Sequence, residues 1–188
     1  GIPVYASVPL SREQSKLNLL LRKGKSEANK EIRLLALDNP ADLAIEALRG
    51  LRTSLHFAMM DAPNNVLMVS GPSPNVGKSF ISANFAAVFA QSGKKVLVVD
   101  ADLRRGTMHN QFNISKKRGL SEVLSRQIEL KDAIQETDVE GLEFLSRGSA
   151  PPNPSELLMS SSFEKFEIVG LISSSTFIFL LKLSLEKI

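Results

Sequence analysis

Gly77, Lys78 and Ser79 lie where an apolar run gives way to a helical pattern, a position suited to binding phosphate. The run Val66–Val69 has no polar alternation, which predicts a buried parallel strand. Apolar residues at positions 81, 85, 88 and 89 recur at helical spacing, so we expect a helix to open at Gly77–Ser79. A loop between such elements directs backbone N–H groups and the helix dipole at phosphate, while Lys78 would pair with β and γ oxygens and Ser79 would reach Mg²⁺.

The loop departs from the pattern G-x-x-x-x-G-K-[ST] at one position. That pattern places glycine at position 72, where the chain has Pro72 preceded by Gly71. The alternative is a Gly-Lys-Ser that only caps a core helix, but the strand and helix on either side favour phosphate binding. The residues we expect to contact the nucleotide are Gly71, Ser73, Pro74, Asn75, Val76, Gly77, Lys78, Ser79 and Phe80.

A second site candidate follows the next apolar run. Residues 95–99 predict another buried strand, which leads into Asp100 and Asp102. Ligands of open α/β sheets bind at the carboxyl ends of the strands, so two carboxylates there can hold Mg²⁺ or accept a proton from an attacking hydroxyl. The alternative is a polar turn between a strand and a helix, which the neighbouring phosphate loop disfavours.

The composition limits the classes of function. The chain has 188 residues, enough for one domain with a core, and no cysteine, so a disulfide framework and a thiolate metal site are excluded. His56 and His109 are the only histidines, too few for a zinc site made of histidines. No signal peptide is visible, and because the first residue is Gly1 we interpret the chain as part of something longer.

The positive charge is concentrated near the N-terminus. Between Arg12 and Arg33 seven basic residues face three acidic ones, whereas the whole chain carries a net charge of only +3. Such a segment is typical of a solvated linker, or of a juxtamembrane segment near anionic lipid if a membrane span precedes it. It has no interleaved aromatic residues, so the pattern does not favour nucleic-acid binding.

A long amphipathic helix is expected to begin at Asp38–Ala41, with a side-chain cap and Pro40 in its first turn, and to end near Met60. Its apolar stripe is predicted at Leu43, Ala47, Leu48, Leu51, Leu55 and Ala58. Glu46, Arg49 and Arg52 recur at steps of three on another face. From the residues alone this arc is a surface with one ion pair, which contributes a few tenths of a kcal/mol.

Downstream, the pattern predicts short helices at 119–124 and 130–134 and a third strand at 141–145. A proline-rich loop then opens a helix within 147–159.

Four motifs, in order, resemble those of the bacterial tyrosine kinases. The segments 71–79 and 98–104 resemble their Walker A and Walker A′ motifs, and 148–158 resembles their G-x-x-P-P-N-P-x-E-L-L signature. Glu46, Arg49 and Arg52 match their E-x-x-R-x-x-R oligomerisation motif, and residues 1–10 resemble the arm that follows their membrane segment. The resemblance extends from Gly1 to about Phe166 and accommodates Pro72.

The resemblance implies a P-loop NTPase-type α/β fold with a parallel sheet and flanking helices. It implies ATP and Mg²⁺ as cofactors and autophosphorylation on tyrosine in trans within a ring of subunits. Lys78, Asp100, Asp102 and Arg104 would be catalytic, with metal ligands from Ser79, Asp100 and Asp102. Glu46, Arg49 and Arg52 would form the subunit interface. The expected partners are the tyrosine-containing tails of neighbouring subunits and the capsule and exopolysaccharide export machinery, at the cytoplasmic side of the bacterial inner membrane.

The C-terminal part departs from this family. Its Walker B segment ends in an aspartate after the proline-rich helix, but the last aspartate of this chain is Asp138. The family's tyrosine cluster is also missing, since Tyr5 is the only tyrosine. We therefore expect an arm and basic linker at 1–37, a partial kinase domain at 38–166 and an aberrant apolar tail at 167–188, from a frameshift or early stop. The sheet would be incomplete on its C-terminal side and the kinase impaired.

Two alternative functions remain at this point. One is an ATPase of the deviant Walker A class, related to partitioning and septum-site proteins. That class carries an extra lysine just after the first glycine, a neighbourhood that Ser73 occupies here. The other is a non-catalytic fragment that docks onto intact subunits through Glu46, Arg49 and Arg52.

Overall fold

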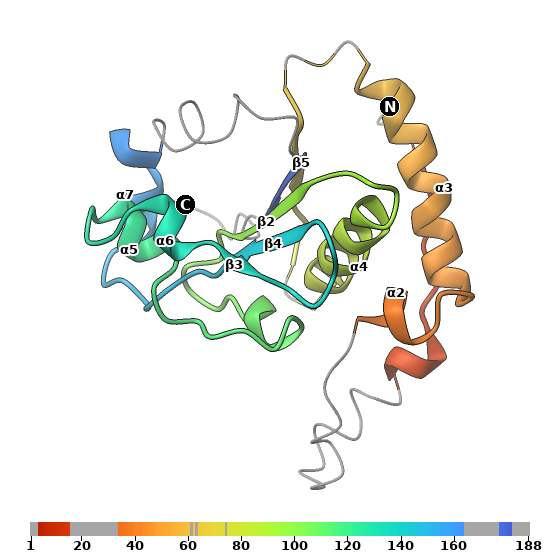
Figure 1. Cartoon of the computed structure of the whole chain (residues 1–188), viewed down its shortest axis with the longest axis horizontal. Coiled ribbons are helices and arrows are strands. Elements are labelled where there is room, and N and C mark those ends of the chain that lie inside the picture. Colours follow the sequence, from red (N-terminus) through yellow and green to blue (C-terminus); the bar gives the residue numbers. More distant parts are fainter. Residues whose placement is uncertain are drawn as a thin grey trace, which may run out of the picture.

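The computed structural model describes residues 4–15, 34–60, 62, 64–73, 75–163 and 177–181, the last of these as main chain. Pro74, the greater part of the basic linker and the rest of the predicted tail lie outside the described residues. A central sheet separates two groups of helices (Figure 1). Its strand order is β1-β5-β2-β4-β3.

Four strands of the sheet run parallel. They are β1 (Val66–Val69), β5 (Phe177–Leu181), β2 (Val96–Asp100) and β4 (Leu142–Leu145). The short β3 (Gln135–Glu136) pairs antiparallel with β4, so the sheet is mixed rather than purely parallel as expected. The second and third predicted strands are confirmed as β2 and β4. β2 is a buried strand as predicted, since all five of its residues are buried.

The predicted burial of the first strand is wrong in part. β1 is parallel, but it forms the outer end of the sheet order, and Met68 is 56% exposed. An apolar run shows that a strand is favourable but not how many neighbours it has, so the run could not reveal an edge. The strand that joins β1 to β2 is β5, which lies within the segment predicted to be an aberrant tail.

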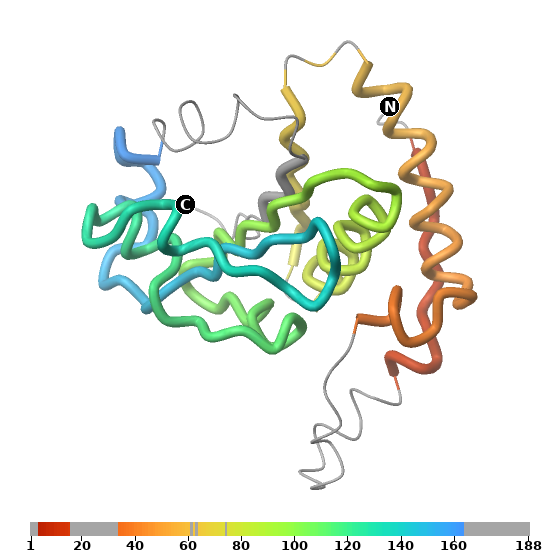
Figure 2. Tube along the Cα trace, in the orientation of Figure 1, coloured from red at the N-terminus to blue at the C-terminus, as the bar shows by residue number. Residues whose placement is uncertain are grey.

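Helices α2 (Leu35–Asp38), α3 (Leu43–Ala58) and α4 (Lys78–Ala90) lie on one side of the sheet. Alternate residues of β2, Val96 and Val98, join their core, which also holds Phe85 and Phe144. Residues 82–90 of α4 are all buried, so this helix lies between α3 and the sheet. Figure 2 shows the N-terminal arm running alongside α3, where the Ser11 hydroxyl donates to the Asp42 carboxylate at 2.8 Å.

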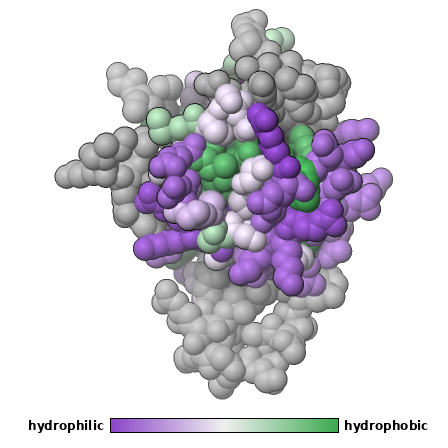
Figure 3. Space-filling view, turned by 90° about the vertical axis from the view of Figure 1, so that its left-hand side faces the viewer, coloured by the Kyte–Doolittle hydropathy of each residue, from purple (hydrophilic) through white to green (hydrophobic). Residues whose placement is uncertain are grey.

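The other side of the sheet carries α5 (Leu120–Leu124), α6 (Leu130–Ala133) and α7 (Pro154–Leu158), which are the three short helices that the sequence predicts. Leu97 and Val99 of β2 face this second core together with Leu103 and Leu145. A 3₁₀ turn, η2 (Met108–Asn110), follows β2. Seen from this side, most of the coloured surface is hydrophilic around a small hydrophobic area (Figure 3).

The start of α3 differs from the prediction. The helix begins at Leu43, and its cap is Asp42, whose carboxylate accepts from the Ala44 N–H at 2.8 Å. Pro40 therefore lies in the turn between α2 and α3 rather than in a first helical turn. The buried face of the first turn also differs from the predicted stripe, because Leu43 is 75% exposed while Ala44 and Ile45 are fully buried.

Candidate functional site: a phosphate loop beside two aspartates

The phosphate loop connects the carboxyl end of β1 to the amino end of α4. Gly77 caps α4 with φ 94°, and Asn75 has φ 60°, so two residues of the loop have left-handed backbone. Glycine adopts that conformation without steric cost, which explains its place at position 77. The turn brings the first N–H groups of α4 into the loop, which is the backbone arrangement that binds anions.

The side chain of Lys78 lies across the phosphate loop. A Cβ added at Gly71 would meet Val76 Cγ2 at 3.0 Å and Lys78 Cδ at 3.3 Å, so the lysine stem passes close to Gly71. The Lys78 amine donates to the Ser73 carbonyl at 2.7 Å. The ammonium group is therefore held over the loop backbone, where bound phosphate oxygens would compete with Ser73 for it.

Helix α4 holds this loop on a rigid support. Asn84 is buried in the middle of the helix, and its side chain accepts from the Ala36 N–H at 2.9 Å and donates to the Phe80 carbonyl at 2.9 Å. The first bond ties α4 to α2, and both together satisfy a buried amide, which would otherwise be costly. Ser79 and Phe80 are half-buried in the first turn.

Asp100 ends β2 inside the protein. Its side chain is fully buried and accepts from the Asp102 N–H at 3.2 Å and the Met108 N–H at 3.3 Å. Burial raises the pKa of Asp100 to about 7, although these two backbone donors and Arg147 act to lower it. A buried carboxylate without a full counter-charge is a group that a divalent cation would stabilise, so Asp100 fits the predicted Mg²⁺ role.

Asp102 lies in the turn that Asp100 holds. Its carboxylate accepts from the Arg105 N–H at 2.8 Å and is half-buried, so it is more accessible to a ligand than Asp100. Arg104 is exposed on the same turn and donates to the Ser155 hydroxyl at 3.3 Å. Both predicted side chains therefore lie just beyond the strand end, with Arg104 directed toward α7.

The sheet register brings the two halves of the site together. Leu181 of β5 is paired with Val69 on one side and with Asp100 on the other, so β1 and β2 end at the same level. With one strand between them, the two strand ends are roughly 10 Å apart. The fold thus brings the phosphate loop and the two aspartates to the same end of the sheet, where the carboxyl ends of the parallel strands lie. Within the described residues, no three His, Cys, Asp or Glu side chains gather as a ready metal cluster.

Comparison with known proteins places this arrangement in a family. Residues 67–165 match the model of the CobQ/CobB/MinD/ParA nucleotide binding domain. The solved kinase domain of Escherichia coli tyrosine kinase ETK is 45% identical, with a TM-score of 0.86 over 100% of this chain and 71% of that one. The chain belongs to the bacterial tyrosine kinase family.

The whole-protein relatives are much longer. The tyrosine-protein kinase etk of Escherichia coli K12 is 51% identical over 164 residues, which is 85% of this chain and 23% of the relative. The chain thus spans about a quarter of the length of that relative. The septum site-determining protein MinD of Pyrococcus horikoshii is 21% identical over 63% of this chain and 48% of that one, with a TM-score of 0.52, and this likeness shows the fold alone.

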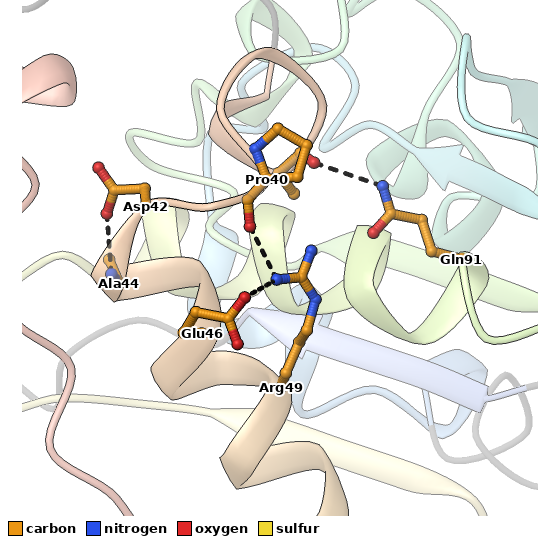
Figure 4. A network of polar contacts seen from close by, with 7 residues as sticks. Pro40, Asp42, Ala44, Glu46, Arg49 and Gln91 are labelled. Atoms are coloured by element: carbon orange, nitrogen blue, oxygen red, sulfur yellow. Dashed lines mark hydrogen bonds and ion pairs between the residues drawn. The ribbon is translucent and has the colours of Figure 1, made fainter.

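The bacterial tyrosine kinase motif on α3 makes its contacts within the chain in this structure. Arg49 forms an ion pair with Glu46 and donates to the Pro40 carbonyl at 2.7 Å, as Figure 4 shows. Arg52 donates to the Val88 carbonyl of α4 at 3.0 Å. Gln91, the C-cap residue of α4, donates to the Ala36 carbonyl nearby at 3.4 Å. Arg49 therefore ties α3 to the turn that precedes it and Arg52 ties α3 to α4, while the ion pair of Glu46 stays within α3.

Sequence reasoning missed Arg147. Its guanidinium donates to the Leu103 carbonyl at 3.1 Å and the Arg104 carbonyl at 3.2 Å, so it clamps the turn that carries Asp102. Arg147 directly precedes Gly148, the first residue of the proline-rich signature. Its place next to this motif is the one feature of the sequence that could have drawn attention to Arg147. Its hydrogen-bond partners lie more than 40 positions earlier in the chain, and no local pattern reveals them.

Glu122 is the second residue that sequence reasoning missed. It accepts from the Gly119 N–H at 2.8 Å and the Ser149 N–H at 3.0 Å, linking α5 to the loop before α7. Burial acts to raise its pKa, but hydrogen bonds from Gly119 and Ser149 outweigh it, and the pKa is lowered overall. Gly148, with φ 80°, lies against this carboxylate. Glu122 thereby fixes the loop that presents Arg147.

Proposed function

We propose that this chain is a kinase domain that binds ATP with Mg²⁺ and transfers the γ-phosphoryl group to tyrosine. The observation that supports it is the common level of the phosphate loop after β1 and the Asp100–Asp102 turn after β2. The proposal also draws on the similarity to proteins that are named tyrosine kinases.

In this proposal each residue acts by position and charge. The loop N–H groups and Lys78 bind the β and γ phosphates, and Lys78 exchanges the Ser73 carbonyl for phosphate oxygens. Ser79, Asp100 and Asp102 would hold Mg²⁺, which when bound neutralises charge on the phosphates. Asp102 is the carboxylate that a tyrosine hydroxyl can approach, and Arg104 adds positive charge near the phosphates.

We further propose the setting that the family suggests. Subunits would form a ring through Glu46, Arg49 and Arg52, and each would phosphorylate tyrosine tails of its neighbours. The process served would be capsule or exopolysaccharide export at the cytoplasmic side of the inner membrane. No helix among the described residues combines the length and hydropathy that crossing a bilayer requires.

Purified protein incubated with labelled ATP and Mg²⁺, with and without a tyrosine-tail peptide, tests the activity. Label on tyrosine supports the kinase, and release of phosphate alone supports a deviant Walker A ATPase instead. Neither activity, with the fold intact, supports the non-catalytic oligomerising fragment. Lys78→Met must abolish any signal that counts, whereas Lys95→Met, which removes the same charge from an exposed site ahead of β2, must leave it unchanged.

A further inference from the structure

A surface pocket lies at the end of α4 that is remote from the phosphate loop. It has a volume of about 260 Å³ and is lined by Arg52, Thr53, His56, Phe57, Phe89, Ser92 and Lys94. The phosphate loop adjoins Lys78 and the pocket adjoins Phe89, near the two ends of a 13-residue helix. At 1.5 Å per residue the 11 positions from Lys78 to Phe89 separate the two places by roughly 16 Å. The pocket is therefore a site of its own.

The charges of the pocket favour an anion. Arg52, His56 and Lys94 bring three basic side chains to it, and none of the seven described residues that line it carries a carboxylate. Arg52 is oriented by its bond to the Val88 carbonyl at 3.0 Å, which fixes the guanidinium along α4. The Thr53 and Ser92 hydroxyls donate within the chain, to the Arg49 and Phe89 carbonyls, so the basic side chains carry the attraction for an anion. A dianionic phosphate is a good match for such a set of donors.

The aromatic residues narrow the class of ligand. Phe89 is 4% exposed and forms an apolar wall, whereas Phe57 is 67% exposed and packs edge-to-face against His56 with ring centroids 5.8 Å apart. Both phenylalanines line the pocket, so an aromatic ring of a ligand would find apolar surface there. Pockets for drug-sized ligands have about 300–1,000 Å³, so this one suits a single side chain better than a nucleotide.

We propose that this pocket binds the phosphotyrosine side chain of another polypeptide. Its ring would pack against Phe57 and Phe89, and its phosphate would meet Arg52 and Lys94. The choice of ligand rests on the proposed kinase function, because phosphotyrosine is the product of that activity. Arg52 also belongs to the proposed subunit interface, so an occupied pocket would link the phosphorylation state of a neighbour to α3.

The test is fluorescence anisotropy with a labelled phosphotyrosine peptide, in the absence of ATP so that a failure of kinase activity does not affect it. Unlabelled competitors are the same peptide without phosphate, a phosphoserine version and inorganic phosphate. We expect only the phosphotyrosine peptide to compete well, and we expect its binding to weaken as salt rises. Saturating ADP with Mg²⁺ should leave binding unchanged, because the phosphate loop is a separate site.

Lys94→Glu and Lys95→Glu form a matched pair of variants. Both lysines are exposed in the segment before β2 and both changes alter the net charge equally, but only Lys94 lines the pocket. Lys94→Glu should weaken binding about tenfold or more, and Lys95→Glu less than about twofold. Equal effects of the two variants, equal competition by inorganic phosphate, displacement by ADP, or no binding by the wild type would each overturn the proposal.

Discussion

Asp100 and Gly106 lie so close that no side chain fits between them. A Cβ added at Gly106 would lie 2.5 Å from Asp100 Oδ2 and 2.6 Å from the Asp102 carbonyl oxygen. The glycine lets the turn fold back over the buried carboxylate, and the Gly106 N–H closes the turn on the Asp102 carbonyl at 2.8 Å. The shape of the acidic half of the site thus depends on a missing side chain.

Gly106→Ala should therefore displace the turn that carries Asp102. We expect a loss of about 1–3 kcal/mol in the free energy of unfolding, as for overpacked cores, together with weaker nucleotide binding. Gly50→Ala is the matched control, since nothing lies within 4 Å of the added atom and alanine suits a helix better than glycine. Denaturant melts and nucleotide titrations of both variants measure the difference, and equal behaviour of the two would contradict it.

The raised pKa of Asp100 predicts a pH dependence of stability. Its pKa in the folded protein is about 7 against 3.8 without the protein environment, so the folded state holds a proton that the unfolded state has lost. Stability should then fall as pH rises between about 4 and 7, by up to about 1.4 kcal/mol per pH unit from this group. His109, whose pKa burial lowers, contributes in the opposite direction below pH 6.5. Denaturant melts from pH 4 to 8 measure the slope.

Asp100→Asn isolates this contribution. The difference in unfolding free energy between wild type and the variant should change steeply between about pH 4 and 7 and level off above it. The contribution of His109 cancels in that difference. A difference that does not vary with pH would show that Asp100 titrates normally.

Arg147→Met should affect both the turn and the titration of Asp100. The variant loses hydrogen bonds to the Leu103 and Arg104 carbonyls and a positive charge that lowers the pKa of Asp100. We expect a higher Asp100 pKa. In denaturant melts from pH 4 to 8, this should appear as an upward shift of the pH range over which stability falls. Arg147→Lys keeps the charge and should keep the window near its original place. If neither variant moves the window, the clamp has no electrostatic role.

The position of β5 between β1 and β2 predicts that the stability of the sheet depends strongly on this short strand. Within the described part of the chain, β1 is hydrogen-bonded to β5 alone, and β5 joins it to β2. Ile178→Pro removes an N–H from a strand paired on both sides, so it should cost on the order of 3 kcal/mol or more and abolish nucleotide binding. Ile178→Val keeps the N–H and serves as the control. Retention of normal melting by the proline variant would contradict the assigned pairing.

A change in the α3 motif should affect the assembly of subunits without much change in the stability of the single chain. Arg49 is half-exposed and its ion pair with Glu46 is on the surface, so Arg49→Ala should change the unfolding free energy by less than about 1 kcal/mol. If the motif also forms the proposed interface, the same variant should lower the mass seen in sedimentation. Thr53→Ala on the next turn is a suitable comparison.

The local parts of the fold could be predicted from the sequence. β2 and α4 were predictable because each is a contiguous apolar pattern next to a chemically distinct loop, and the same holds for Gly77, Lys78 and Asp100. The start of α3 was not, because three potential capping residues lie within five positions and Asp42 alone accepts a bond from the helix backbone. Local pattern does not choose among such neighbours.

The non-local parts could not be predicted in the same way. The edge position of β1 and the interior position of β5 depend on which strands pair, and the apolar run 177–181 carries no mark of its partners. Arg147 is similar, since its carbonyl partners belong to a distant turn. The roles assigned to Glu46, Arg49 and Arg52 remain a prediction, as do those of the nucleotide-binding residues.

The sheet order also has a consequence for synthesis on the ribosome. β1 leaves the ribosome roughly 110 residues before β5, the strand that connects it to β2. Until β5 emerges, the phosphate loop has no completed sheet beneath it, and none of the described strands made earlier pairs with β1. The nascent chain must therefore keep this segment from premature association while the residues between β1 and β5 are made, a period in which chaperones bind such surfaces.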